Sequence, residues 1–291
     1  MKSLTPTTSG ILLYITAVFL MSVMDLTAKA LSAELPVLEV VWARYMGQTV
    51  VVTLIVLPRI RQVARTNYPG LQFLRSLFVL GATSMFFFGV SQMGLAETTA
   101  IMDVNPVLIT LGAALFLGEK LGPRRLIGIG AALLGAMIII RPGSAVFSPF
   151  ALLPMGAAIC YSGFALVTRH VGQGETVWTS LFYTALLGAA VLSVAVVPIW
   201  VTPSPKALAL MVMIGFIAAS GQFLLIRAFT LAEASTVAPF SYVGLLFATL
   251  WGAIFFGNFP DRATLIGAAI VVVAGIYVWH RETREARRQA A

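Results

Sequence analysis

Apolar residues run through this chain in long blocks that short polar or turn-forming segments interrupt. A membrane-spanning helix needs about 20 mostly apolar residues. Breaks such as Arg141-Pro142-Gly143 and Thr202-Pro203-Ser204-Pro205 separate neighbouring blocks. The pattern predicts an all-α integral membrane protein with transmembrane helices over residues 10–31, 36–57, 72–93, 97–117, 123–141, 149–170, 176–199, 206–229, 234–256 and 262–280.

The composition also indicates that lipid surrounds much of the chain. The 291 residues are 59% hydrophobic and only 10% charged, whereas a soluble domain carries about 25% charged residues. The first block is too long for a signal-peptide core and further blocks follow it, so we interpret it as a retained span. Cys160 is a lone cysteine, which forms no intrachain disulfide, and no Cys/His cluster has metal spacing. We therefore expect no metal and no cofactor.

Positive charge is distributed unevenly between the loops, and this predicts the orientation. With the N-terminus inside, the outer side holds only Lys29, Arg44, Arg141, Lys206 and Arg262. The inner side collects Lys2, Arg59, Arg61, Arg65, Arg75, Lys120, Arg124, Arg125, Arg169, Arg227, Arg281, Arg284, Arg287 and Arg288. We therefore expect both termini in the cytoplasm. The net charge of +8 then reflects topology and anionic lipid, and no nucleic acid partner is expected.

Short motifs recur in the same order in the two halves of the chain. Leu95-Ala96-Glu97 returns as 231–233, the Glu39–Trp42 segment as 175–178, and Leu126-Ile127-Gly128 as 265–267, at offsets of 136, 136 and 139. A repeat of five spans is odd, so the second copy would enter the membrane from the opposite side. Inverted repeats are a plan of secondary transporters, which hold substrate between the repeats near the midplane. A scaffold or assembly subunit is the structural alternative.

The chain resembles the drug/metabolite transporter superfamily, with two EamA-type domains. Gly118-Glu119-Lys120, the following Leu126-Ile127-Gly128 and the stretch 231–242 carry the resemblance over nearly the whole chain. Lys29 and Arg44 match EamA positions, and Arg169 stands where the partner of Lys29 belongs. Asn258 departs from the family, which usually has Glu there. The resemblance implies repeats over 1–142 and 148–281, a basic tail over 282–291 and a bacterial inner membrane, and within it the chain is similar to YddG-type exporters of aromatic amino acids.

Ionisable residues at membrane depth are costly and usually face a cavity or a partner. Asp25 lies four residues before Lys29, so the two share a helix face and can form an ion pair near the outer interface. The alternative is that Asp25 lines the solute path or carries a proton. Arg44 lies ~12 Å below the outer end of its span, where it would pair with a carboxylate or line water. Arg75 and Arg227 lie nearer the inner ends, as expected for snorkelling anchors.

Two corresponding spans contain a proline beside polar residues. Asp103 and Asn105 precede Pro106, and Pro239 precedes Ser241 and Tyr242. Proline inside a span kinks the helix and frees backbone carbonyl groups. Kinks in corresponding spans of both halves indicate a transporter site, although a packing kink has the same pattern. We predict Pro106 and Pro239 as hinges and the polar residues beside them as site-lining.

The family architecture implies a central cavity between the spans, to which other residues would contribute. Methionine and aromatic side chains suit apolar or aromatic ligands, and the lone amides need partners. Helix packing and lipid contact are the alternative role for each. The further candidates are Met24, Ser84, Met85, Phe88, Gln92, Tyr161, Phe164, Gln222 and Phe223.

Three functions compete. No Gly-x-x-x-x-Gly-Lys-[Ser/Thr] loop is present, so transport would run on gradients. The first function is export of small amphipathic metabolites, amino acids first, by a protein expected to act as a monomer in the lipid bilayer. The second is uptake of a metabolite such as S-adenosylmethionine or a sugar derivative. The third is a membrane-embedded enzyme, which would require Asp25 and Asp103 to meet as a dyad, since His170 and His280 sit near span ends.

Overall fold

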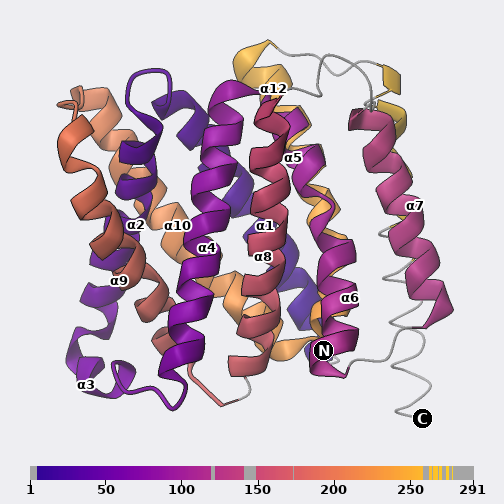
Figure 1. The fold of residues 1–291 in the computed structure, drawn as a ribbon, viewed down its shortest axis with the longest axis horizontal. Helices are drawn as coiled ribbons and strands as arrows, with labels where there is room; N and C mark the ends of the chain where they lie inside the picture. Colours follow the sequence, from indigo (N-terminus) through magenta and orange to yellow (C-terminus); the bar gives the residue numbers. More distant parts are fainter. Residues whose placement is uncertain are drawn as a thin grey trace, which may run out of the picture.

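In the computed structural model, every regular element within the described residues is a helix (Figure 1). The structure describes residues 5–118, 122–140, 149–172, 174–257 and several positions between 262 and 277. The elements in chain order are α1 (Pro6–Leu31), α2 (Val37–Val56), η1 (Leu57–Arg59), α3 (Ile60–Val63), α4 (Pro69–Gln92), α5 (Leu95–Met102), α6 (Asn105–Leu117), α7 (Pro123–Ile140), η2 (Pro149–Ala151), α8 (Leu152–Val171), α9 (Val177–Ala195), η3 (Val197–Ile199), α10 (Pro205–Leu231), α11 (Ala234–Val237), η4 (Ala238–Tyr242) and α12 (Val243–Phe256).

Among the described residues, six helical segments are long and apolar enough to cross a membrane: Pro6–Leu31, Val37–Val63, Pro69–Gln92, Leu152–Val171, Val177–Ala195 and Pro205–Leu231. The predicted spans 97–117 and 234–256 are each broken, into α5 and α6 and into α11, η4 and α12. Much of the predicted span 262–280 and the tail 282–291 lie outside the described residues. The chain is thus a multi-pass helical membrane protein, and the count of ten spans stays a prediction.

Helix ends follow the local sequence. The Thr5 hydroxyl accepts the Thr8 N–H at the start of α1, and Thr176 accepts the Thr179 N–H at the start of α9. Such side-chain caps satisfy N–H groups that the first helical turn leaves unpaired. The helices α6 and α12 both end at a glycine in the left-handed conformation, Gly118 (φ 68°) and Gly257 (φ 66°). Glycine adopts this conformation without a Cβ penalty.

The helix ends correct the register of the internal repeat. α1 and α8 end at 31 and 171, and α2 and α9 begin at 37 and 177, an offset of 140. α4 and α10 end at 92 and 231, and the two left-handed glycines follow at 118 and 257, an offset of 139. Two of the three recurring motifs gave 136. Their register is therefore wrong by about one helical turn, because Leu95-Ala96-Glu97 opens α5 whereas Leu231-Ala232 closes α10.

The two repeats run in opposite directions and exchange packing partners. In Figure 1, α1 begins at the lower face and α8 at the upper face. α1 packs along α10 and α4 packs along α8, while α2 and α9 contact each other. Exchanging α1 with α8, α2 with α9 and α4 with α10 maps this set of contacts onto itself. We call the face where α1 begins the N-face and the opposite one the far face.

Apolar side chains cover the outer surface as well as the core. Leu54, Leu115, Phe116 and Val194 are 66%, 79%, 78% and 77% exposed. A helix bundle in lipid needs no polar outer face, because its backbone groups are paired within the helices. Consequently neither surface of a helix is marked by polarity, and only the packing decides which residues turn inward.

Candidate substrate cavity

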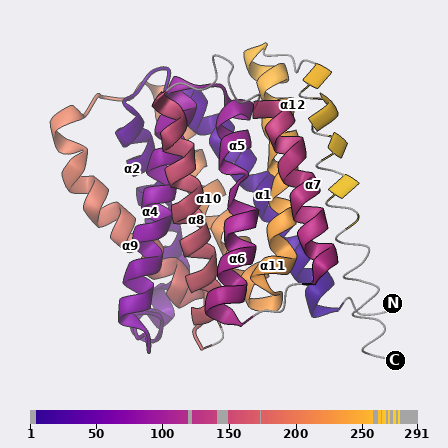
Figure 2. The same ribbon diagram turned by 45° about the vertical axis from the view of Figure 1, so that its right-hand side comes forward.

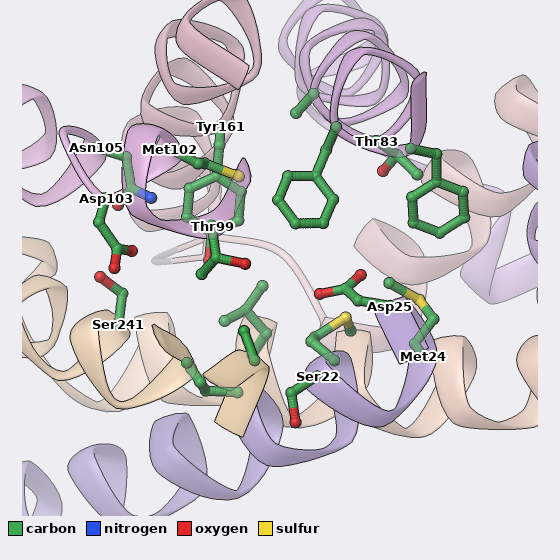
Figure 3. A pocket seen from close by; sticks show the side chains of 18 of the residues that line it. Ser22, Met24, Asp25, Thr83, Thr99, Met102, Asp103, Asn105, Tyr161 and Ser241 are labelled. Carbon is green, nitrogen blue, oxygen red and sulfur yellow. The ribbon is translucent and has the colours of Figure 1, made fainter. Parts of the chain in front are cut away.

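A cavity of about 140 Å³ lies between the two repeats (Figure 3). Its volume is below the ~300–1,000 Å³ of sites for drug-sized ligands, so this conformation suits a small metabolite. Figure 2 shows the broken pairs α5–α6 and α11–α12 beside α1 at the centre of the fold. The cavity is lined by Tyr14, Val18, Met21, Ser22, Met24, Asp25, Arg44, Val79, Ala82, Thr83, Phe86, Phe87, Leu95, Thr99, Met102, Asp103, Asn105, Tyr161, Gln222, Leu225, Ser241, Gly244 and Ala248.

The broken helices bring main chain and polar side chains to this cavity. A turn at Asp103 and Val104 separates α5 from α6, and Pro106 stands in the first turn of α6. In the second half the 3₁₀ turn η4, which contains Pro239 and Ser241, separates α11 from α12. The Ser162 hydroxyl of α8 donates to the Asn105 carbonyl at 3.3 Å. Irregular backbone at membrane depth is tolerated where protein buries it or where it lines a cavity.

One end of the cavity is rich in polar groups without protein partners. We call Tyr14, Asp103, Asn105, Tyr161 and Ser241 the Asp103 pole. Figure 3 shows the Asp103 carboxyl group and the Ser241 hydroxyl group pointing toward each other, with Asn105 beside Asp103. Among the described residues, no partner reaches Asp103 Oδ2 or Asn105 Oδ1. Buried polar atoms are normally paired, so this pole can hydrogen-bond a polar ligand or water.

The other end combines a carboxylate with a guanidinium. We call Met24, Asp25, Arg44 and Thr83 the Asp25 pole. Arg44 is 1% exposed, its Nε lies 3.3 Å from Met24 Sδ, and its guanidinium lies 4.3 Å from the centre of the Tyr45 ring. Asp25 interacts electrostatically with Arg44. The predicted neighbourhood of Arg44 and a carboxylate is therefore present, and the carboxylate is that of Asp25.

Apolar side chains connect the two poles. Met21 comes from α1, Phe86 and Phe87 from α4, Met102 from the end of α5, and Leu225 from α10. Thioether and aromatic groups adapt to apolar or aromatic ligands. The cavity can thus hold an amphipathic molecule with its apolar part against this wall.

Eight of the predicted site residues line the cavity: Met24, Asp25, Arg44, Asp103, Asn105, Tyr161, Gln222 and Ser241. The four candidates from α4 do not. Met85 and Phe88 are 37% and 38% exposed, Gln92 is exposed at the helix end, and Ser84 is half-buried outside the cavity lining. The reason is helical geometry, because the stripe of α4 that faces the cavity runs through Val79, Ala82, Thr83, Phe86 and Phe87.

Three aromatic candidates lie behind or beside the cavity wall. Phe164 is fully buried with its ring centre 5.8 Å from that of Tyr161. Phe223 packs on Trp178 at 4.9 Å between ring centres. Tyr242 is 1% exposed, and within the described residues its hydroxyl has no partner. All three contribute to helix packing in this conformation, and a contact with substrate stays a prediction.

Lys29 and Arg169 form equivalent caps at opposite faces. Lys29 Nζ donates to the carbonyl groups of Val90 and Met93, both at 3.1 Å, at the end of α4. Arg169 Nη1 donates to the carbonyl groups of Phe229 and Thr230, at 3.0 and 3.4 Å, at the end of α10. Cations stabilise helix C-termini through the free carbonyl groups and the helix dipole. The predicted equivalence of the two residues is thus a geometric one, and these main-chain bonds replace the expected Asp25–Lys29 pair.

Arg75 is buried rather than snorkelling, which corrects the expectation for this residue. Its side chain is 0% exposed and donates to Thr168 Oγ1 at 3.5 Å, to the Ser180 carbonyl and to Thr184 Oγ1. Its guanidinium also lies 5.4 Å from the centre of the Phe164 ring. Acceptors on α8 and α9 meet its two terminal nitrogen atoms at depth, while its Nε has no partner among the described residues. Arg227, by contrast, is exposed.

Arg44 and Arg75 both belong to the first repeat, but the Arg75 guanidinium lies among residues of the second repeat that correspond to Arg44 and its neighbour Met24. At the repeat offset of 140, Phe164 is the counterpart of Met24 and Thr184 is the counterpart of Arg44. Arg44 contacts Met24, while Arg75 contacts Phe164 and Thr184. The two groups differ in their surroundings, since Arg44 lines the cavity and Arg75 is enclosed by polar acceptors.

Several residues that line the cavity were not predicted from the sequence, although the spacing along α1 indicates them. Tyr14, Val18, Met21, Ser22 and Asp25 follow the spacing of one helix face. Once Asp25 is taken as facing a cavity, that spacing would have identified the other four. The apolar members of the α4 stripe give no such signal, because lipid-facing residues look the same.

The two carboxyl groups do not form a dyad. Figure 3 shows Asp103 beside Asn105 and Ser241, and Asp25 on the other side of the cavity beyond Thr99. In the described part of the chain, no group of three or more His, Cys, Asp or Glu residues is placed to hold a metal ion.

The fold and the cavity define a multi-pass membrane protein with two helical repeats around a central site. The EamA-like transporter family model matches residues 8–141 and 149–279, so the chain belongs to the EamA-like transporter family. This confirms the resemblance of the sequence to the drug/metabolite transporter superfamily.

Named relatives transport chemically different solutes. The chain is 31% identical to a riboflavin transporter of Rhizobium johnstonii (78% of this chain, 75% of the relative) and 31% identical to the pseudopaline exporter CntI of Pseudomonas aeruginosa (92% and 95%). It is 26% identical to an S-adenosylmethionine uptake transporter of Rickettsia bellii (89% of each). A crystal structure that shares the fold has a TM-score of 0.77 at 20% identity, over 98% of this chain and 99% of the other.

Proposed function

We propose that the protein is a secondary transporter that exports small amphipathic metabolites, hydrophobic or aromatic amino acids first. The observation that carries the proposal is the cavity between the repeats, with a polar pole at each end and an apolar wall between them. Such a cavity pairs the charged groups of an amino acid and holds its side chain away from water.

Alternating access is the proposed mechanism. In it, ten spans in two inverted sets of five rock against each other around the fixed cavity. Two broken helices at the seam support this mechanism, because their 3₁₀ or turn segments can absorb changes in backbone angle. Pro106 and Pro239 are the proposed hinges. The loop charges favour cytoplasmic termini, and the bacterial relatives favour insertion in a bacterial inner membrane.

Uptake of another metabolite is the second candidate. The relative named for S-adenosylmethionine uptake supports it, because relatives of this chain are named for uptake as well as for export. The small volume of the cavity favours a compact amino acid over a molecule as large as riboflavin. No enzymatic step is part of either proposal.

Flux from proteoliposomes tests the function. The purified full-length chain is reconstituted, the vesicles are loaded with labelled phenylalanine, tryptophan, methionine or threonine, and release is followed. We expect saturable release that protein-free vesicles lack. Absence of flux for all four amino acids, together with flux of S-adenosylmethionine, would replace amino acid export by the second candidate.

A further inference from the structure

Arg44 presents a buried positive group to the cavity with spare hydrogen-bonding capacity. A guanidinium carries five N–H groups. In the described structure Nε meets only the thioether sulfur of Met24, and Nη1 has no partner. A thioether is a weak acceptor, and a charge at membrane depth normally has a stronger one. The guanidinium also lies on the Tyr45 ring, but the group that best completes its hydrogen bonds is a carboxylate, which can accept two parallel ones.

Asp25 supplies the opposite charge from the neighbouring helix. Figure 3 shows its carboxyl group pointing from α1 into the cavity. Within the part of the chain that the structure describes, no salt bridge of 4.0 Å or less joins it to Arg44, although the two interact electrostatically. No hydrogen bond from a described residue engages the Asp25 carboxylate either. A negative and a positive group therefore face the same space without closing on each other.

We infer that Arg44 and Asp25 form a recognition site for a zwitterionic head group. The carboxylate of the ligand binds the Arg44 guanidinium, and its ammonium group binds the Asp25 carboxylate. The rest of the ligand extends along the wall of Phe86, Phe87 and Met102. The inference rests on the proposed role as a transporter of small metabolites and specifies which chemical class the cavity selects.

Charge balance selects this class over ligands with a single charge. A zwitterion adds no net charge, and each of its charges meets an opposite one. A simple amine would leave Arg44 without a carboxylate, and a simple carboxylate would bring a second negative group beside Asp25. A phosphate would place up to two negative charges against one guanidinium. Uncompensated charge at this depth is costly, so selectivity arises from the repulsion as well as from the attraction.

A matched set of probes tests the site on the purified full-length protein in detergent. The probes share a phenyl ring: L-phenylalanine has both charges, phenethylamine only the amine, and 3-phenylpropanoate only the carboxylate. Ligand-dependent thermal unfolding gives each dissociation constant. We expect L-phenylalanine to bind best, and to bind about 10- to 100-fold more weakly after Arg44→Gln or Asp25→Asn, as for a lost charged hydrogen bond.

The single-charge probes separate recognition from general damage. Arg44→Gln should leave phenethylamine binding unchanged or stronger, and Asp25→Asn should do the same for 3-phenylpropanoate. A damaged fold would weaken all probes together, and Arg44→Lys, which keeps the charge, should retain part of the binding if the fold is intact. The matched controls are Arg227→Gln on the exposed face of α10 and Glu34→Gln, whose partners are Ser204 Oγ at 3.1 Å and the exposed Lys206 at 3.8 Å.

Failure of this inference differs from failure of amino acid export. If L-phenylalanine does not bind but S-adenosylmethionine or L-threonine binds with the same dependence on Arg44 and Asp25, the zwitterion site stands and aromatic amino acid export falls. Equal binding of all three phenyl probes, loss that follows Asp103→Asn instead of Asp25→Asn, or no binding of any zwitterion overturns the site.

Discussion

The backbones of the two repeats approach each other closely where α2 crosses α10. A Cβ atom added at Gly215 would lie 2.5 Å from Gly47 Cα and 2.8 Å from the Gly47 carbonyl carbon. Ordinary van der Waals contact begins near 3.4 Å. The atoms in the way belong to the backbone and cannot rotate aside. Gly215→Ala should therefore push the two helices about 1 Å apart, and such a gap forfeits a quarter to a half of each dispersion contact.

The change in stability caused by Gly215→Ala is the sum of two opposing terms. Overpacking of a tight interface costs about 1–3 kcal/mol. Alanine in place of a helical glycine stabilises by up to ~1 kcal/mol, which partly hides the steric cost. Gly130, an exposed residue within α7, has nothing within 4 Å of an added Cβ, so Gly130→Ala gains the helical term alone. The stability difference between the two variants should thus be the steric term, about 1–3 kcal/mol.

Thermal unfolding of the purified variants in one detergent measures this difference. At ~2–4 °C for each kcal/mol in a protein of this size class, Gly215→Ala should unfold several degrees below Gly130→Ala. Gly47→Ala should behave like Gly215→Ala, because its Cβ would lie 2.7 Å from Gly215 Cα. Equal unfolding temperatures for the Gly215 and Gly130 variants would refute the argument that this crossing depends on backbone contact.

Other expectations concern protonation and the two caps. Asp103→Asn removes the one titratable carboxyl group of the Asp103 pole, so we expect flux in proteoliposomes to lose part of its pH dependence; an unchanged pH–flux profile would remove Asp103 as a proton carrier. Arg169→Gln and Lys29→Gln each remove charged hydrogen bonds to the carbonyl groups at a helix end, so each should cost about 1.5–3 kcal/mol. Unfolding temperatures equal to that of the unaltered protein would contradict this role, and Arg61→Gln in the exposed helix α3 serves as the control.

Local sequence predicted the features that depend on one helix at a time. The apolar blocks gave the helices, and charge at depth drew attention to Asp25, Arg44 and Asp103, all of which line the cavity. Arg75 was misjudged by the same reasoning. Its depth is visible in the sequence, but the hydroxyl and carbonyl groups that solvate it come from α8 and α9, about 90 to 110 residues away.

Repeat register was the second feature beyond reach of the sequence. Two of the three short motifs matched at an offset of 136, while the third motif and the helix ends matched at 139 or 140. Lys29 and Arg169 are related by the offset of 140, and each donates hydrogen bonds to carbonyl groups at the end of a helix.

The sequence by itself determined that this chain is a membrane protein, that it is helical, and that it contains an internal repeat. Hydrophobicity and turn chemistry are local properties, and they add up along the chain without knowledge of the fold. Only the tertiary structure decided that Phe86 and Phe87 face the cavity while Met85 and Phe88 face outward. In lipid both faces of a helix are apolar, so the sequence carries little record of which face turns inward, and packing alone selects it.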